Sequence, residues 1–459
     1  MTRRFVTSRR GFLRRFLGSA ALVGLATSTG APARAQLFTP SGTPTTPAST
    51  TDPTSGMSRP SAAPATTTAA PYTPLQLLPI LDGLPTPERA RDVIDRLGRG
   101  SERVRVGFSG VFRYMMDVNP ARDFEVVTTR LDEIVATARA ADVPFLVHLN
   151  GGRWAGGGPL VERLMGDGRV MAWDHLDRPW SYPKDGEFHF SLGAYNELVR
   201  KYKRRNLQVA ARWLASFAAS PDGRLFAGVS TDSEVLINLH KWSDYNPLVI
   251  QEYVHWLGSE GVYAVGTGRW SGQGRDFNLR AVNERYGTSF ARWKDVTPPR
   301  EEGDSDYWRD WLRFRSLLVD HNVQEQVDWI VEAGILGERV FAHQSPSIGG
   351  DVHADVIQAA QVDGAGTGIT TYGELAGDAA LFERVRGFGA PWGIFEYNPR
   401  TDDEDACLAA IRASHVHGAS IVCPYHWDDM GGDNEVGYTI RGTAFERALR
   451  RFVEQPAPA

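Results

Sequence analysis

Glutamates follow two of the short apolar runs in this 459-residue sequence within four residues. Glu234 follows the run Phe226–Ser230, and Glu396 follows Gly393–Phe395. Two carboxyl groups that face each other can divide the work of acid and base. One gives its proton to a departing oxygen while the other, ionised, attacks carbon or orders a water. Cleavage of a glycosidic bond needs this division of roles, so the pair is the first candidate for a catalytic site.

The distance between the two carboxyl groups would set the stereochemistry. A separation of roughly 5–5.5 Å favours retention through a covalent intermediate, and roughly 6.5–9.5 Å favours inversion. If Glu234 proves dispensable, Asp232 is the reserve acid. Other polar residues follow the same runs and are expected to bind sugar hydroxyls, orient the carboxylates or stack on a sugar ring. These are His148, Asn150, Arg153, Trp154, Asp232 and His343.

Eight apolar runs must position these side chains. The runs are nearly continuous rather than alternating, as expected of strands that are buried on both faces of a parallel sheet. Every gap between them is long enough for the helix that a parallel crossover needs. The predicted strands are Leu75–Leu81, Val104–Phe108, Phe145–Leu149, Phe226–Ser230, Val340–His343, Gly368–Thr371, Gly393–Phe395 and Ser420–Cys423.

Helical patterns fill most of the gaps, with apolar residues three or four apart. Thr86 followed by Pro87 is typical of an N-cap and the first helical position. The predicted helices are Pro87–Leu97, Asp123–Ala141, Ala194–Phe217, Pro247–Leu257, Trp308–Val331, Val352–Ala359, Ala379–Val385, Asp403–His415 and Ala444–Val453.

Eight strand–helix units predict an α/β fold, a single closed (β/α)₈ barrel. A doubly wound open sheet is the alternative, although no Gly-rich phosphate fingerprint follows any strand. The long insertions Asn150–Phe190 and Ser259–Glu302 are expected over the carboxyl ends of the strands, where barrels build their sites.

The chain before the barrel divides into two segments. Residues 1–35 combine a basic start, a short apolar run and a small-residue cleavage site, as in a signal peptide. Ser8-Arg9-Arg10-Gly11-Phe12-Leu13 resembles the twin-arginine export motif, which predicts a periplasmic, cell-surface or extracellular protein. The alternative is the basic amphipathic start of a cytosolic domain. Residues 36–72, rich in Thr, Pro, Ser and Ala, are expected to form a disordered linker, leaving 73–459 for the barrel.

The charge limits which classes of partner the chain is expected to bind, and the cysteine content limits its disulfides. The net charge is -5, and residues 1–35 hold seven Arg and no acid, so residues 36–459 carry -5 − 7 = -12. Such an acidic body should repel polyphosphates, which argues against a nucleic-acid partner. No segment is expected to span a membrane, no cofactor is implied, and the oligomeric state is not predicted. Cys407 and Cys423 are expected to be buried thiols, with one disulfide as the alternative.

The chain resembles clan A glycoside hydrolases and is most similar to family 42, the β-galactosidase group. Asp232-Ser233-Glu234 stands where that family has Asp-Asn-Glu, and the segment Val282–Trp293 is similar to the helix and turn that follow. The resemblance implies Glu234 as acid/base and Glu396 as nucleophile. It also implies Tyr372 as the strand-six tyrosine near the nucleophile and Trp427 as the floor of the first sugar site. Ser233 in place of Asn and the lack of a Cys cluster for zinc depart from the family.

Two other functions remain open at this point. In a metal-dependent barrel hydrolase, His148, Asp232, His343 and His426 would gather round one cation. No metal is expected under the favoured interpretation, because no strand carries paired His residues. A non-catalytic barrel that binds glycans is the other alternative, and the retention of both Glu residues argues against it.

Overall fold

A computed structural model describes most of the chain after residue 73. The described residues are 74–151, 158–165, 167–171, 173–178, 181–184, 187–190, 196–233, 245–258, 263–264, 269–270, 279–344, 361–428 and 439–456. The predicted signal and linker segments, and the predicted helix Val352–Ala359, lie outside these residues.

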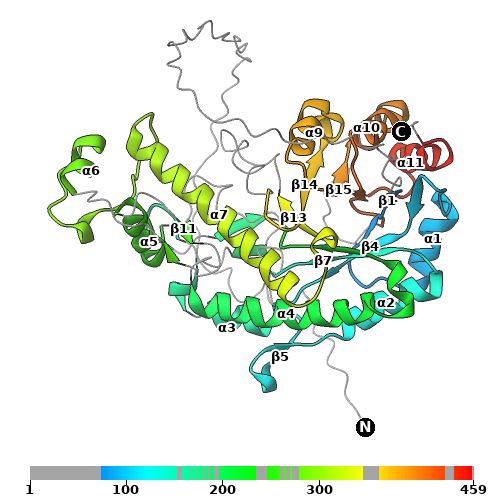
Figure 1. The fold of residues 1–459 in the computed structure, drawn as a ribbon, viewed down its shortest axis with the longest axis horizontal. Helices are drawn as coiled ribbons and strands as arrows, with labels where there is room; N and C mark the ends of the chain where they lie inside the picture. Colours follow the sequence, from blue (N-terminus) through cyan, green and yellow to red (C-terminus); the bar gives the residue numbers. More distant parts are fainter. Residues whose placement is uncertain are drawn as a thin grey trace, which may run out of the picture. The chain divides into compact units, whose positions relative to one another are not determined.

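The core of the fold is one curled parallel sheet (Figure 1). Its order along the sheet is β2-β4-β7-β10-β13-β14-β15-β16-β1-β3, and every pairing is parallel. The strands are β1 (Leu75–Leu77), β2 (Ile80–Leu81), β3 (Val104–Val106), β4 (Phe108–Phe112), β7 (Phe145–Leu149), β10 (Phe226–Ser230), β13 (Val340–Gln344), β14 (Gly366–Tyr372), β15 (Trp392–Asn398) and β16 (Ile421–Pro424).

The ten strands form the eight strand positions of a closed barrel, because two positions are each divided into two strands. We call each of these eight positions a stave and number them in chain order. Pro79, which has no N–H to donate, lies between β1 and β2, and Gly107 lies between β3 and β4. A Cβ at Gly107 would come within 1.9 Å of the Pro144 carbonyl oxygen, so this close approach requires glycine. β1 pairs with β16 and β3, while β2 pairs with β4. The ring therefore closes, which confirms the predicted barrel and excludes the open sheet.

Helices surround the barrel and agree closely with the predicted ranges. α1 begins at Pro87, and Thr86 Oγ1 accepts a hydrogen bond from Arg89 N–H at 3.4 Å, as the N-cap prediction requires. The helices between staves are α1 (Pro87–Leu97), α2 (Thr129–Ala141), α3 (Pro159–Met165), α4 (Glu197–Ala218), α5 (Pro247–Gly258), α6 (Leu279–Tyr286), α7 (Asp306–Glu332), α9 (Ala379–Arg386) and α10 (Glu404–Val416), followed by α11 (Ala444–Glu454).

One helix prediction began too early. The range Asp123–Ala141 was expected to be helical, but α2 starts at Thr129. Asp123 and Phe124 have positive φ angles of 51° and 57°, a conformation that an α-helix does not contain. Within this segment Glu125–Val126 instead forms strand β6, which pairs antiparallel with β5 (Val118–Asn119).

The insertion after stave four builds a second, smaller core. Figure 1 shows α5 and α6 beside the first half of α7, at the margin of the barrel. Tyr253 packs against both Trp311 and Phe314, with ring centroids 5.1 and 5.2 Å away, and all three side chains are fully buried. The hairpins β8 (Ser181–Lys184) with β9 (Glu187–Phe190) and β11 (Tyr263–Ala264) with β12 (Arg269–Trp270) belong to the two predicted insertions.

Cys407 on α10 and Cys423 on β16 are both buried and both free thiols, which settles the choice in favour of the unpaired state. Among the described helices, none combines the length and the hydropathy needed to cross a bilayer.

The barrel interior contains a polar layer between apolar ones. His148 bonds through Nδ1 to Ser230 Oγ at 3.0 Å and through Nε2 to Ser109 Oγ at 3.1 Å. His343 Nε2 bonds to Thr370 Oγ1 at 2.9 Å. Phe395 packs against both imidazoles, with centroids 6.1 and 5.7 Å away. Burial lowers the pKa of His148 to about 3 and holds that of His343 well below its ordinary value. Both rings are therefore neutral at pH 7.

This buried pair predicts acid sensitivity of the fold. Unfolding returns each imidazole to a pKa of about 6.5, so the stability they contribute is present above that pH and is lost as the pH falls toward 3. Between pH 7 and pH 5 we expect His148 to contribute a loss of about 2 kcal/mol in urea unfolding, and His343 to add to it in the same direction. His343→Gln keeps a polar partner for Thr370 and should reduce this loss. His255→Gln, at an exposed position of α5, is the matched control variant. Equal pH dependence in the wild type and His343→Gln would contradict the assignment.

Candidate active site

The mouth of the barrel is the ring formed by the carboxyl ends of the staves. Glu396 lies on β15 at this end, and its side chain is partly exposed. The hydroxyl of Tyr372, the last residue of β14, donates a hydrogen bond to Glu396 Oε2. The Arg400 guanidinium lies over the Tyr372 ring, 4.6 Å from its centroid. The two staves thus present an oriented carboxylate at the mouth.

Asp232 follows β10 and is fully buried, with its carboxylate held by three donors. Tyr114 Oη–H donates to Oδ1 at 2.8 Å, the Gly151 backbone N–H donates to the same oxygen at 2.6 Å, and Lys203 forms a short ion pair with Oδ2. Burial, with a smaller contribution from Asp232, raises the pKa of Tyr114 well above its ordinary value. The phenol therefore stays protonated and continues to donate. Asp232 fixes the stave-four end and has no access to a substrate, so it does not fit the role of reserve acid.

Asn150 and Ser233 join the ends of two adjacent staves. Asn150 follows β7, and its Nδ2–H donates to Ser233 Oγ at 3.1 Å. The Asn150 backbone N–H donates to the Phe112 carbonyl at 2.9 Å, which continues the ladder from stave two. The side chains of both residues are at most 6% exposed. This contact fixes the backbone immediately before Glu234.

Two charged residues at the mouth were missed by the sequence analysis. Asp82 follows β2, and Arg113 follows β4; Arg113 Nη2–H donates to Asp82 Oδ1 at 3.4 Å. The predicted second strand stopped at Phe108, whereas the stave continues to Phe112. A strand extended across Ser109-Gly110 would have placed Arg113 at the mouth.

His148 and His343 do not reach the mouth. They were expected to contact sugar hydroxyls, but both lie inside the barrel with exposures of 4% and 0%. Hydroxyls of Ser109, Ser230 and Thr370 take up three of their four ring nitrogens. Their location corrects the expectation: they form part of the layer on which the mouth rests.

Trp427 was expected to provide the floor of a sugar site, but its position does not agree with that expectation. The indole is fully buried in the main core, and its Nε1–H donates to Asp92 Oδ2 on α1 at 2.9 Å. A side chain with no exposed face cannot stack on a ligand. Tyr425, two residues earlier, is partly exposed and lies 6.2 Å from the Tyr372 ring.

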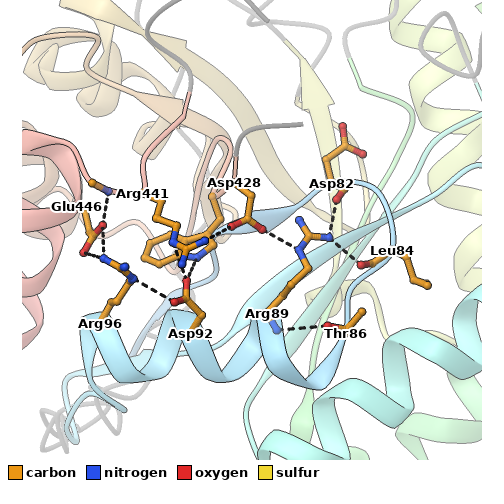
Figure 2. A network of polar contacts seen from close by, with 11 residues as sticks. Asp82, Leu84, Thr86, Arg89, Asp92, Arg96, Asp428, Arg441 and Glu446 are labelled. Atoms are coloured by element: carbon orange, nitrogen blue, oxygen red, sulfur yellow. Dashed lines mark hydrogen bonds and ion pairs between the residues drawn. The ribbon is translucent and has the colours of Figure 1, made fainter. Parts of the chain in front are cut away.

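An ion-pair network holds the stave-eight end against α1 (Figure 2). Arg89 Nε–H donates to Asp428 Oδ2 at 2.7 Å, and Arg441 lies 3.3 Å from Asp92 and 3.8 Å from Asp428. At the other end of the network, Arg96 pairs with both Asp92 and Glu446. The charges alternate along the network, so each carboxylate has a cation beside it. The network fixes both Trp427 and Asp428.

Three predicted site residues, Glu234, Arg153 and Trp154, lie outside the described residues. Within the described ranges, no group of three or more His, Cys, Asp or Glu side chains is arranged to hold a metal ion. Of the four residues suggested for a cation, Asp232 is paired with Lys203, and His148 and His343 are bonded to hydroxyls. These contacts do not form the coordination set that the metal-dependent alternative requires.

Comparison with known proteins shows similarity in fold. No protein-family model and no curated protein matches the sequence. β-Galactosidase from the psychrophilic Marinomonas ef1 superposes with a TM-score of 0.58 at 14% identity, covering 83% of this chain and 59% of that one. The catalytic domain of β-amylase from Paenibacillus polymyxa gives 0.59 at 10% identity, covering 85% and 100%. Apo exo-carrageenase GH42 from Bacteroides ovatus gives 0.53 at 10% identity, covering 83% and 51%.

The chain thus spans about three-fifths of the β-galactosidase and half of the exo-carrageenase, and it covers the whole β-amylase domain. At these identities the similarity is one of architecture. The chain has the barrel fold of these three solved glycoside hydrolases.

The buried pair of Lys203 and Asp232 predicts a large stability effect. Lys203→Met would leave the Asp232 carboxylate buried without its cation and should cost about 3–5 kcal/mol of unfolding free energy. Urea denaturation followed by circular dichroism measures this cost. Lys203→Met combined with Asp232→Asn should recover part of the loss, because the uncompensated charge is then gone. Lys201→Met, on the same helix but without a buried partner, is the control. A cost below about 1 kcal/mol for Lys203→Met, as for a surface pair, would contradict the account.

Proposed function

We propose that this protein is a secreted retaining glycoside hydrolase acting on an oligo- or polysaccharide. The observation that carries the proposal is the partly exposed Glu396, hydrogen-bonded by Tyr372 at the mouth of a closed (β/α)₈ barrel. The three solved structures of similar fold support a glycosidase in general, since each is named for cleavage of a carbohydrate.

In this proposal Glu396 is the nucleophile. The Tyr372 hydroxyl donates to one carboxylate oxygen of Glu396 and so sets the orientation of that carboxylate. Attack on the anomeric carbon then forms a covalent glycosyl–enzyme ester while the bond to the leaving oxygen breaks. Because the nucleophile is placed before the substrate arrives, little reorganisation is required during the reaction.

Glu234 is the proposed acid/base, on the strength of its place in the sequence directly after Ser233. The Asn150–Ser233 hydrogen bond and the three donors to Asp232 fix the chain up to that residue. Protonated Glu234 would give its proton to the leaving oxygen, and its carboxylate would then deprotonate the water that releases the sugar. Arg153 and Trp154, which follow stave three, remain proposed substrate-binding residues.

Substitution of the two glutamates tests the mechanism. A screen against aryl glycosides and cell-wall polysaccharides first identifies a substrate. Glu396→Gln and Glu234→Gln should each lower kcat by several orders of magnitude, since each removes a required group. Sodium azide should restore turnover of an aryl glycoside by Glu396→Gly and yield a glycosyl azide of inverted configuration. Glu374→Gln, an exposed glutamate after β14, is the control and should keep wild-type turnover. Near-wild-type kcat in Glu396→Gln would refute the assignment, and glycan binding without turnover in the wild type would favour the non-catalytic barrel.

Export is a separate part of the proposal and rests on residues 1–35. The adjacent Arg9 and Arg10 are the basis of the twin-arginine assignment. In a bacterial host with this export pathway, Arg9→Lys with Arg10→Lys should retain the uncleaved precursor in the cytoplasm. Immunoblots of cell fractions measure the distribution, and Arg14→Lys with Arg15→Lys is the matched control. Equal export of both double variants would contradict the proposal.

A further inference from the structure

A pocket of about 500 Å³ lies at the end of the barrel opposite the mouth. It is formed where the amino-terminal parts of β3, β7 and β10 meet the loops that lead into them. Its apolar floor includes Val106, Val143 and Leu225, each at most 4% exposed. The pocket shares no residue with the candidate active site.

Three arginines and one aspartate line the pocket. Arg99 donates to the carbonyls of Ala141 and Asp142 at 3.2 and 3.1 Å, which fixes its guanidinium at the end of α2; among the described residues no carboxylate pairs with it. Arg224 donates to Asp142 Oδ1 at 2.6 Å. All four charged residues are exposed at the rim of the pocket, and within the described part of the chain Arg105 has no hydrogen-bond or ion-pair partner for its side chain. Three cations and one carboxylate leave a charge of +2 at the pocket.

The surrounding charges support this count. Hydrogen bonding and charge from Arg224, with a smaller contribution from Arg99, lower the pKa of Asp142, so the carboxylate is ionised at neutral pH and the field around it is positive. Residues 36–459 carry -12 in total, as derived above. A concentration of positive charge on such an acidic body attracts anions to this pocket.

We propose that the pocket binds a small dianionic oxyanion, a phosphate or sulfate group. Guanidinium groups form paired hydrogen bonds with such groups, and two negative charges match the +2 of the lining. No aromatic side chain lines the pocket, so it lacks the flat face that sugar rings stack on and is not an extension of the proposed glycan site. The group can belong to free inorganic phosphate or to a small organic monoester whose apolar part rests on the floor.

Calorimetric titration of the full chain tests the proposal. Inorganic phosphate and phenyl phosphate are titrated separately at a fixed ionic strength set with sodium chloride. Each should bind saturably with one site per chain. Tighter binding of phenyl phosphate would identify an organic monoester as the natural form, and equal binding would identify free phosphate. Heats that do not saturate for either ligand would overturn the proposal.

Substitutions with opposite expected effects separate binding from folding. Arg105→Gln should raise Kd at least about tenfold, the loss expected of one charge-assisted hydrogen bond. Asp142→Asn should lower Kd, because it removes the carboxylate from the lining and releases Arg224. Asn also tolerates the left-handed conformation of residue 142, whose φ is 49°. Arg447→Gln, which removes an exposed cation of α11 that pairs with Glu404 of α10, is the control and should bind as the wild type does. A wild-type Kd in Arg105→Gln, or weaker binding in a folded Asp142→Asn, would also overturn the proposal.

Discussion

Closure of a parallel sheet is the constraint on which the site depends. In a ring of parallel strands every carboxyl end faces the same opening, so side chains far apart in the sequence are brought to one mouth. Glu396 and Tyr372 meet across β15 and β14, and Asn150 and Ser233 meet across β7 and β10. None of these contacts is local in sequence. They follow from the register of neighbouring staves, which the buried side chains on both faces of the sheet specify.

The mouth is supported by polar groups that a substrate does not reach. Beneath it, His148 and His343 are neutral and bonded to hydroxyls of the adjacent staves. Beside it, Asp232 is enclosed by Tyr114, Gly151 N–H and Lys203. A buried carboxylate is tolerated because the cation and both hydrogen bonds compensate the loss of water. Catalytic side chains need such support, since small displacements of a reacting group reduce the rate sharply.

Local signals predicted much of the fold. Strands Phe145–Leu149 and Phe226–Ser230 and helix Pro87–Leu97 match their observed bounds, because continuous apolar runs and a Thr-Pro cap are readable in one sequence. The helix predicted from Asp123 began too early, because Asp123 and Phe124 have a left-handed backbone conformation. A stripe of apolar residues gives no information about that conformation. Residue type and position in the sequence could not distinguish His148, which lies inside the barrel, from Glu396, which lies at the mouth. Which side chain enters the interior and which reaches the mouth depends on packing around the whole ring.

The same limit explains Lys203 and Trp427. Lys203 lies within a long amphipathic helix, and its partner Asp232 is 29 positions away. Trp427 follows a strand as a substrate-binding aromatic would, but it packs in the core against α1. Both positions result from long-range contacts between elements, for which a strand-end pattern gives no signal.

The distance between the carboxyl groups of Glu234 and Glu396 tests the central claim most directly. A crystal structure of the exported protein would supply it. The account predicts about 5–5.5 Å between the two groups, with both facing the barrel mouth. Carboxyl groups more than about 10 Å apart, or Glu234 turned away from the mouth, would contradict it.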